Sequence, residues 1–89
     1  MTESPLTVWR KKAGLTQADI AKLADVSQAH VSEIECGVTE LCDPIAGFLQ
    51  RIADRGDSEM SREAGEVPEK QAEFFREKQE ERLQRVGAA

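Results

Sequence analysis

The stretch TQADIAKLADVSQAHVSEIECG, residues 16–37, decides the fold of this 89-residue chain. Apolar side chains recur in it at helical spacings on either side of a short polar break. This pattern predicts two short helices, over about residues 17–24 and 28–35. Thr16 and Ser27 each stand just before one of these helices, where an N-cap belongs. The side chains expected to face inward are Ile20, Ala21, Ala24, Val26, Val31 and Ile34.

Two helices joined by a tight turn in this way form a helix-turn-helix motif. The stretch resembles the family of phage Cro and lambdoid repressors, also called Xre-like regulators. The resemblance rests on Gly14-Leu15-Thr16-Gln17, Ile20-Ala21, Val26-Ser27 and Ser32-x-Ile34-Glu35-x-Gly37, and it covers roughly residues 5–55. It implies a compact all-α domain of the lambda-repressor type that binds double-stranded DNA as a homodimer.

The second motif helix, residues 28–35, is the expected recognition helix, and its N-terminal residues would enter the major groove. Gln28 can bond adenine bidentately, Glu33 can accept from cytosine, and the Ala29 methyl can meet a thymine methyl. The family resemblance implies a phosphate contact for Gln17. The alternative for all these residues is a solvated helix face. The candidate DNA-binding residues are Lys11, Lys12, Gln17, Ser27, Gln28, Ala29, His30, Ser32 and Glu33.

The resemblance also implies an ion pair between Arg10 and Glu35 that ties the first helix to the end of the recognition helix. Lys11 and Lys12 either contact phosphate or only suit the dipole at the end of their helix. Three positions depart from the family. Asp25 occupies the turn position that is usually Gly, Cys36 follows the recognition helix, and residues 38–42 contain no Lys or Arg.

The flanking segments complete a four-helix domain. Ser4-Pro5 and Asp43-Pro44 each combine a capping residue with Pro, as at a helix start. The expected common core consists of Leu6, Trp9, Leu15, Ile20, Val31, Ile34 and Ile52.

The chain is expected to divide into a DNA-binding domain (1–55), a polar linker (56–66) and a charged amphipathic C-terminal helix (67–89) that begins at Pro68. So polar a helix is marginal alone and needs a partner surface. It could pack on its own domain, pair with a second subunit or bind another protein. The residues expected to serve dimerisation or partner binding are Phe74, Phe75, Leu83 and Val86.

Composition excludes several other classes. The net charge of −5 argues against indiscriminate nucleic-acid binding. No apolar run is long enough to span a bilayer, and no secretory signal is evident, so a cytoplasmic protein is expected. Cys36 and Cys42 are expected to be free thiols, with no metal site or cofactor. One His and no glycine-rich phosphate loop argue against an enzyme.

Two functions remain after these exclusions. The first is a sequence-specific transcriptional repressor. It would bind a palindromic operator as a homodimer through residues 28–35. The alternative is an antitoxin-like or other protein-interaction module whose C-terminal helix holds a protein partner.

Overall fold

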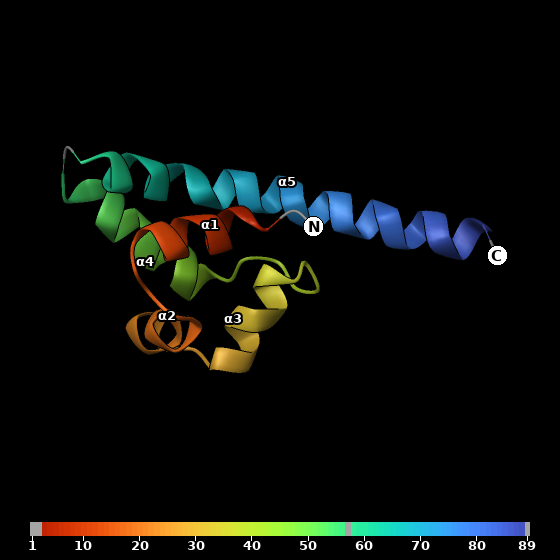
Figure 1. Ribbon diagram of the computed structural model, residues 1–89, viewed down its shortest axis with the longest axis horizontal. Coiled ribbons are helices and arrows are strands. Elements are labelled where there is room, and N and C mark those ends of the chain that lie inside the picture. The colour runs from red at the N-terminus through yellow and green to blue at the C-terminus, as the bar shows by residue number, and fades with distance from the viewer. Residues whose placement is uncertain (1–2, 57, 89) are drawn as a thin grey trace.

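The computed structural model describes residues 3–56 and 58–88, without the side chains of residues 85–88. The helices within these residues are α1 (Pro5–Lys12), α2 (Gln17–Ala24), α3 (Gln28–Glu35), α4 (Asp43–Asp54) and α5 (Glu59–Ala88). Figure 1 shows α2 and α3 at one edge of the molecule and α5 along the opposite edge, with α1 and α4 between them. The all-α architecture expected from the sequence is therefore confirmed.

Side-chain caps start the first three helices. The hydroxyl groups of Ser4, Thr16 and Ser27 each accept a hydrogen bond from the backbone N–H three residues further along. At α2 the cap is reciprocal, because the Asp19 carboxylate accepts from the Thr16 N–H at 2.9 Å. This backbone bond, together with the Thr16 hydroxyl, lowers the pKa of Asp19. The caps fix where these helices begin.

The turn within the motif passes through Asp25, which has φ 58° and ψ 48°. This is the left-handed conformation expected there, and Asp enters it more readily than most side chains do. The start of α4 corrects a prediction. Its N-cap is Cys42, whose side chain makes no capping bond, while Asp43 and Pro44 lie inside the first turn. Asp43 therefore stabilises the helix through its charge near the positive end of the dipole.

The predicted linker over residues 56–66 is wrong for most of its length, because α5 already begins at Glu59. Ser58 caps it by accepting from the Ser61 N–H at 3.2 Å. Pro68 does not start this helix but lies inside it. An interior Pro removes one backbone hydrogen bond and costs roughly 3 kcal/mol, so packing must compensate for it. The compensating face is a helical stripe formed by Met60, Ala64, Val67, Gln71 and Phe74.

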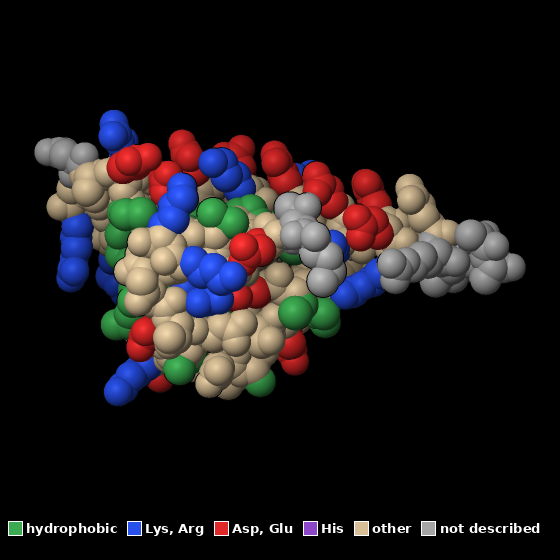
Figure 2. All heavy atoms as spheres, in the orientation of Figure 1, with side chains coloured by type: hydrophobic (Ala, Val, Ile, Leu, Met, Phe, Trp, Pro, Cys, Tyr) green, Lys and Arg blue, Asp and Glu red, His purple; other side chains and the backbone are tan. Residues whose placement is uncertain are grey.

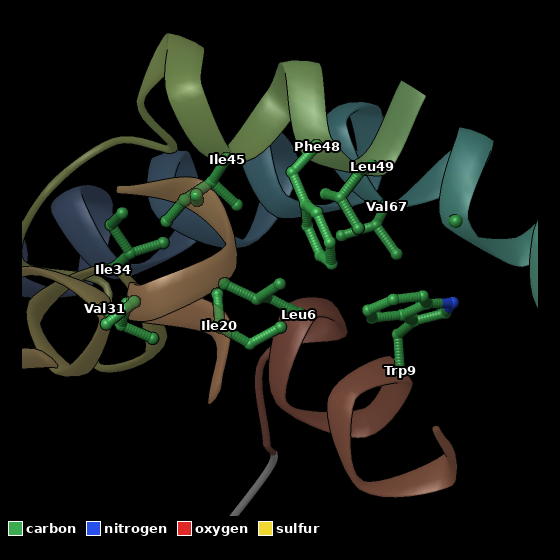
Figure 3. Close-up of a cluster of buried hydrophobic side chains, with 12 residues drawn as sticks. Leu6, Trp9, Ile20, Val31, Ile34, Ile45, Phe48, Leu49 and Val67 are labelled. Atoms are coloured by element: carbon green, nitrogen blue, oxygen red, sulfur yellow. The ribbon is translucent and has the colours of Figure 1, made fainter. Parts of the chain in front are cut away.

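The buried core draws on all five described helices (Figure 3). Trp9 of α1 meets Phe48 of α4 edge to face, with ring centroids 6.3 Å apart. Its indole N–H donates to the backbone C=O of Met60 in α5 at 3.0 Å. Of the predicted core, Leu6, Trp9, Ile20, Val31 and Ile34 are buried, and Leu15 and Ile52 are partly buried. Because Ala64 and Val67 complete the cluster, the N-terminal part of α5 belongs to the same core as α1 and α4.

The C-terminal part of α5 extends beyond the other helices (Figure 1). With 30 residues and about 1.5 Å of rise per residue, α5 accounts for most of the 48 Å length of the molecule. None of the described helices is long and apolar enough to cross a membrane. The molecule is thus a compact bundle with a projecting helical arm.

Candidate nucleic-acid interface

The recognition helix α3 has one anchored face and one open face. Val31 and Ile34 are fully buried and hold it against the core. Ala29 and Glu33 are exposed on the other face, and Gln28 is exposed at the first residue of the helix. A short helix with a polar open face is the element that enters a major groove in helix-turn-helix proteins.

The remaining predicted base-contact residues differ in burial and in whether their polar groups already form hydrogen bonds within the protein. His30 and Ser32 are half-buried. The Ser27 hydroxyl already accepts the capping bond from the His30 N–H at 3.1 Å. The Glu33 carboxylate accepts from the Thr39 hydroxyl at 3.4 Å, which ties it to the following loop. Of the candidates on α3, Gln28 is therefore the residue best placed for a bidentate contact.

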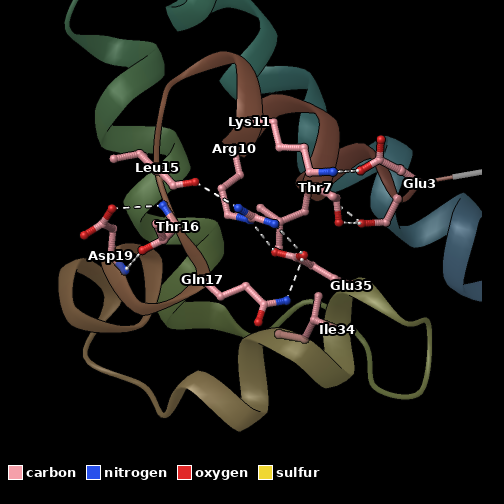
Figure 4. Close-up of polar contacts among 12 residues, drawn as sticks. Glu3, Thr7, Arg10, Lys11, Leu15, Thr16, Gln17, Asp19, Ile34 and Glu35 are labelled. Atoms are coloured by element: carbon pink, nitrogen blue, oxygen red, sulfur yellow. Dashed lines mark hydrogen bonds and ion pairs between the residues drawn. The ribbon is translucent and has the colours of Figure 1, made fainter.

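The structure contains the ion pair between Arg10 and Glu35 (Figure 4). Arg10 donates from Nε to Glu35 Oε2 at 2.8 Å and from Nη2 to Oε1 at 3.1 Å. A third donor, Nη1, reaches the backbone C=O of Leu15 at 2.9 Å. The two side chains are only 12% and 6% exposed. This bidentate geometry fixes the last residue of α3 to α1.

Burial by itself would raise the pKa of Glu35, but the hydrogen bonds it accepts outweigh this effect. Arg10, Gln17 and Thr7 all donate to the carboxylate, and the net pKa lies below its ordinary value. Gln17 donates from Nε2 to Glu35 Oε1 at 3.1 Å. An amide nitrogen carries two hydrogens, so one hydrogen on Gln17 Nε2 is left over from this bond.

Lys11 and Lys12 are each paired with a carboxylate near α1 or α5. Lys11 pairs with Glu3, and Lys12 pairs with Glu63 of α5 at 3.2 Å. This pair directs the Lys12 ammonium to α5. The structure does not bring Lys12 together with the α3 side chains.

Few positive charges lie around the recognition helix. Residues 13–42 contain one Lys, at position 22, and the carboxylates Asp19, Asp25, Glu33, Glu35 and Glu40. In Figure 2, Lys and Arg side chains gather over α1, the α3 region is mostly uncharged, and Asp and Glu side chains follow α5. Non-specific phosphate attraction is therefore weak at this face, and any affinity must come from a few directed contacts.

The four residues expected to serve dimerisation or partner binding fall into different environments. Phe74 is buried within the monomer at 8% exposure, and the Lys78 ammonium lies 5.4 Å from its ring centroid. It packs against Gly37, just after the recognition helix. Phe75 is half-buried at the edge of a surface hollow, and Leu83 is 72% exposed. The side chain of Val86 lies outside the described residues.

No group of three His, Cys, Asp or Glu side chains that could hold a metal ion occurs in the described part of the chain. Cys36 is exposed, Cys42 is half-buried, and both are free thiols.

Two residues that support the interface were missed at the sequence level. Gln71 of α5 donates to the C=O of Ile34 near the end of α3, and Thr7 of α1 helps to lower the pKa of Glu35. The stripe of residues 60, 64, 67, 71 and 74 has helical spacing and could have located Gln71. No sequence signal identifies Thr7 as a neighbour of Glu35, because a Thr at this position is already explained by its hydrogen bond with the capping Ser4.

Residues 8–41 match a family model described as Helix-turn-helix. The matched segment contains α2, the turn, α3 and the Arg10–Glu35 pair. Neither the search of curated proteins nor that of solved structures found a match. This family is a DNA-binding regulatory one. The match over residues 8–41 supports the resemblance of this chain to the Cro/Xre-like helix-turn-helix family.

Proposed function

We propose that the protein is a sequence-specific transcriptional regulator, a repressor, that binds a palindromic operator as a homodimer through α3. The observation that carries this proposal is the arrangement of α3. Its C-terminal residue is fixed by Arg10, whereas Gln28 and Ala29 at its N-terminal end are exposed. A fixed helix with free polar groups at its leading end can present them to base edges.

Specificity in this proposal comes from a small set of contacts. Gln28 bonds the N6 and N7 positions of adenine, and the Ala29 methyl packs on a thymine methyl. Gln17 holds a phosphate with its second amide hydrogen while the first stays on Glu35. Because residues 13–42 carry a single Lys, these contacts contribute a large share of the binding energy, and salt dependence is shallow.

A single copy offers too few contacts for stable binding, which favours a dimer. The proposed dimer surface is the outer face of α5 next to the loop that follows α3. It contains a hollow of about 260 Å³ lined by Glu40, Leu41, Pro68, Ala72, Phe75 and Arg76. The lining combines apolar side chains with one carboxylate and one guanidinium. In a two-fold contact, Glu40 of one copy can meet Arg76 of the other.

Selection from a random duplex library tests the function. The proposal predicts enrichment of palindromic sites with half-sites about one helical turn apart and a dimer in sedimentation on that duplex. Recovery of unrelated sequences, with binding governed only by salt concentration, would contradict it.

A second function, capture of a protein partner by the arm of α5, is favoured by the exposure of Leu83 beyond the bundle. Sedimentation of the full chain and of a chain ending at residue 79 separates the two uses. The proposed dimer surface lies within residues 40–76 and is kept in the shorter chain, so its dimer should persist. A dimer that dissociates on this truncation would contradict that surface and place self-association in the arm. A full-length monomer that binds the operator only after a purified protein partner is added assigns it to partner capture.

A further inference from the structure

We propose that Gln71 is a positioning residue for DNA reading, because its buried amide ties the C-terminal end of α3 to the N-terminal end of α1. The inference rests on the proposed role of α3 as the recognition helix. It assigns to α5 a part in DNA binding that is separate from any contact with a second protein.

Gln71 makes one hydrogen bond to each of two other helices. Its side chain is 1% exposed. The Leu6 N–H of α1 donates to Gln71 Oε1 at 2.9 Å. Gln71 Nε2 donates to the C=O of Ile34, near the end of α3, at 2.9 Å. A single side chain on α5 therefore joins segments that are 65 and 37 residues away in the sequence.

Both partners are groups that helix ends leave without an intrahelical bond. In the first turn of α1, Pro5 has no N–H and Thr7 donates to the Ser4 hydroxyl. Leu6 is the residue whose N–H needs an outside acceptor, and Gln71 supplies it. At the other end, the Ile34 C=O receives the amide N–H of Gln71 in addition to the Gly37 N–H.

The chemistry of the two contacts requires an amide at this position. The group facing the Leu6 N–H must accept, and the group facing the Ile34 C=O must donate. Glu has nearly the same shape and keeps the acceptor, but it places a carboxylate oxygen against the Ile34 C=O. A buried polar group left without a suitable partner is costly, so this change acts selectively on the end of α3.

The position of the tie explains why it would matter for DNA reading. The helix α3 has only eight residues, or about 12 Å of length. Its last two residues are held by two separate contacts, Ile34 by Gln71 and Glu35 by Arg10. Both contacts lead back to α1. With one released, α3 can change its tilt about the buried Val31, and the exposed Gln28 at the other end shifts with it.

The test compares Gln71→Glu with Gln84→Glu. Gln84 is exposed on the same helix, so this control matches the change in charge without touching α3. Each protein is titrated against the duplex that the wild type selects from a random library and against a scrambled duplex. Circular dichroism first identifies a temperature at which all the proteins are fully folded.

We expect Gln71→Glu to bind the selected duplex at least about fivefold more weakly, the low end of the discrimination from one bidentate base contact. Binding to the scrambled duplex should be unchanged, and Gln84→Glu should match the wild type on both. Gln71→Met, which removes both bonds without adding charge, takes the place of Gln71→Glu if the latter does not fold, with the same expectation. Wild-type affinity for both duplexes, or an equal loss on both, would overturn the positioning role.

If the wild type itself prefers no duplex, the proposed function fails while the tie can still be judged. Backbone amide NMR shifts of the free proteins provide this separate readout. If Gln71 positions α3, Gln71→Glu should change the amide chemical shifts along all of α3, including that of Gln28. Gln84→Glu should leave these chemical shifts unchanged. Shifts confined to the neighbours of residue 71 would overturn the inference.

Discussion

The guanidinium of Arg10 meets the carboxylate of Glu35 through two hydrogen bonds of 2.8 and 3.1 Å, which join α1 to the last residue of α3. Both side chains are largely shielded from water. A charge pair in such a place is costly to break, because the remaining partner stays buried and unpaired.

Arg10→Ala is therefore expected to lower the free energy of unfolding by about 3–5 kcal/mol. Urea denaturation followed by circular dichroism measures the loss. Lys11→Ala is the matched control, because Lys11 follows Arg10 on α1 and makes an exposed ion pair with Glu3. That change should cost under about 1 kcal/mol. Equal losses for the two variants would contradict a stabilising role for the buried pair.

The lowered pKa of Glu35 predicts an acid dependence of stability. A carboxyl whose folded-state pKa is depressed stabilises the protein above its unfolded value, 4.5 for Glu. This contribution is lost as the pH falls through the folded-state pKa. The unfolding free energy of the wild type should therefore decrease more steeply below about pH 4.5 than that of Glu35→Gln. Parallel curves from neutral pH to pH 2 would show that Glu35 is not the group responsible.

Gly37 and Gly14 offer a matched pair for the contact between α5 and the end of α3. Both have positive φ, 77° and 74°. A Cβ atom at Gly37 would lie 2.6 Å from Lys78 Cγ, whereas one at Gly14 would meet nothing within 4 Å. Gly37→Ala should therefore destabilise the protein by more than Gly14→Ala, by about 1–3 kcal/mol for the added overpacking.

Lys78→Ala provides the control for that comparison, since it removes the Cγ atom nearest to the built Cβ. In this background the excess cost of Gly37→Ala should shrink, as measured by a double-mutant cycle in urea. A cost that stays the same would place the strain in the backbone alone.

Truncation tests the finding that α5 completes the core. A chain ending at residue 56 loses Ala64, Val67 and Gln71, whose side chains are all buried. We expect it not to show a cooperative thermal transition. A chain ending at residue 79 keeps these residues and should melt cooperatively. Native-like melting of the shorter chain would contradict the role of α5 in the core.

The sequence predicted the local features of the fold well, because caps and helical apolar patterns are encoded by residues close together. Thr16, Ser27 and the left-handed Asp25 all lie where their chemistry places them. The residue at which α5 begins was predicted wrongly. Pro68 is a strong helix-start signal, and its cost in the interior is offset only by tertiary packing of residues such as Val67, which a local pattern does not reveal.

The candidate interface was predictable only in part. The exposure of Ala29 and Glu33 follows from the position of Val31 and Ile34 on the opposite face of the same helix, whereas Gln28 is exposed at the first residue of the helix. The orientation of Lys12 toward Glu63 and the two hydrogen bonds of Gln71 depend on where α5 packs. The local sequence does not determine the position of α5. The features that were missed are therefore those that depend on the tertiary position of α5.

Reading of DNA by α3 through Gln28 is tested by the affinity of Gln28→Ala for the duplex that the wild type selects. Gln50→Ala, an exposed change on α4, is the control. Gln28→Ala should lose about 1–3 kcal/mol of discrimination at one base pair of each half-site, while Gln50→Ala should behave as the wild type. Base reading by Gln28 requires this loss. Unchanged affinity and unchanged base preference for Gln28→Ala would contradict it.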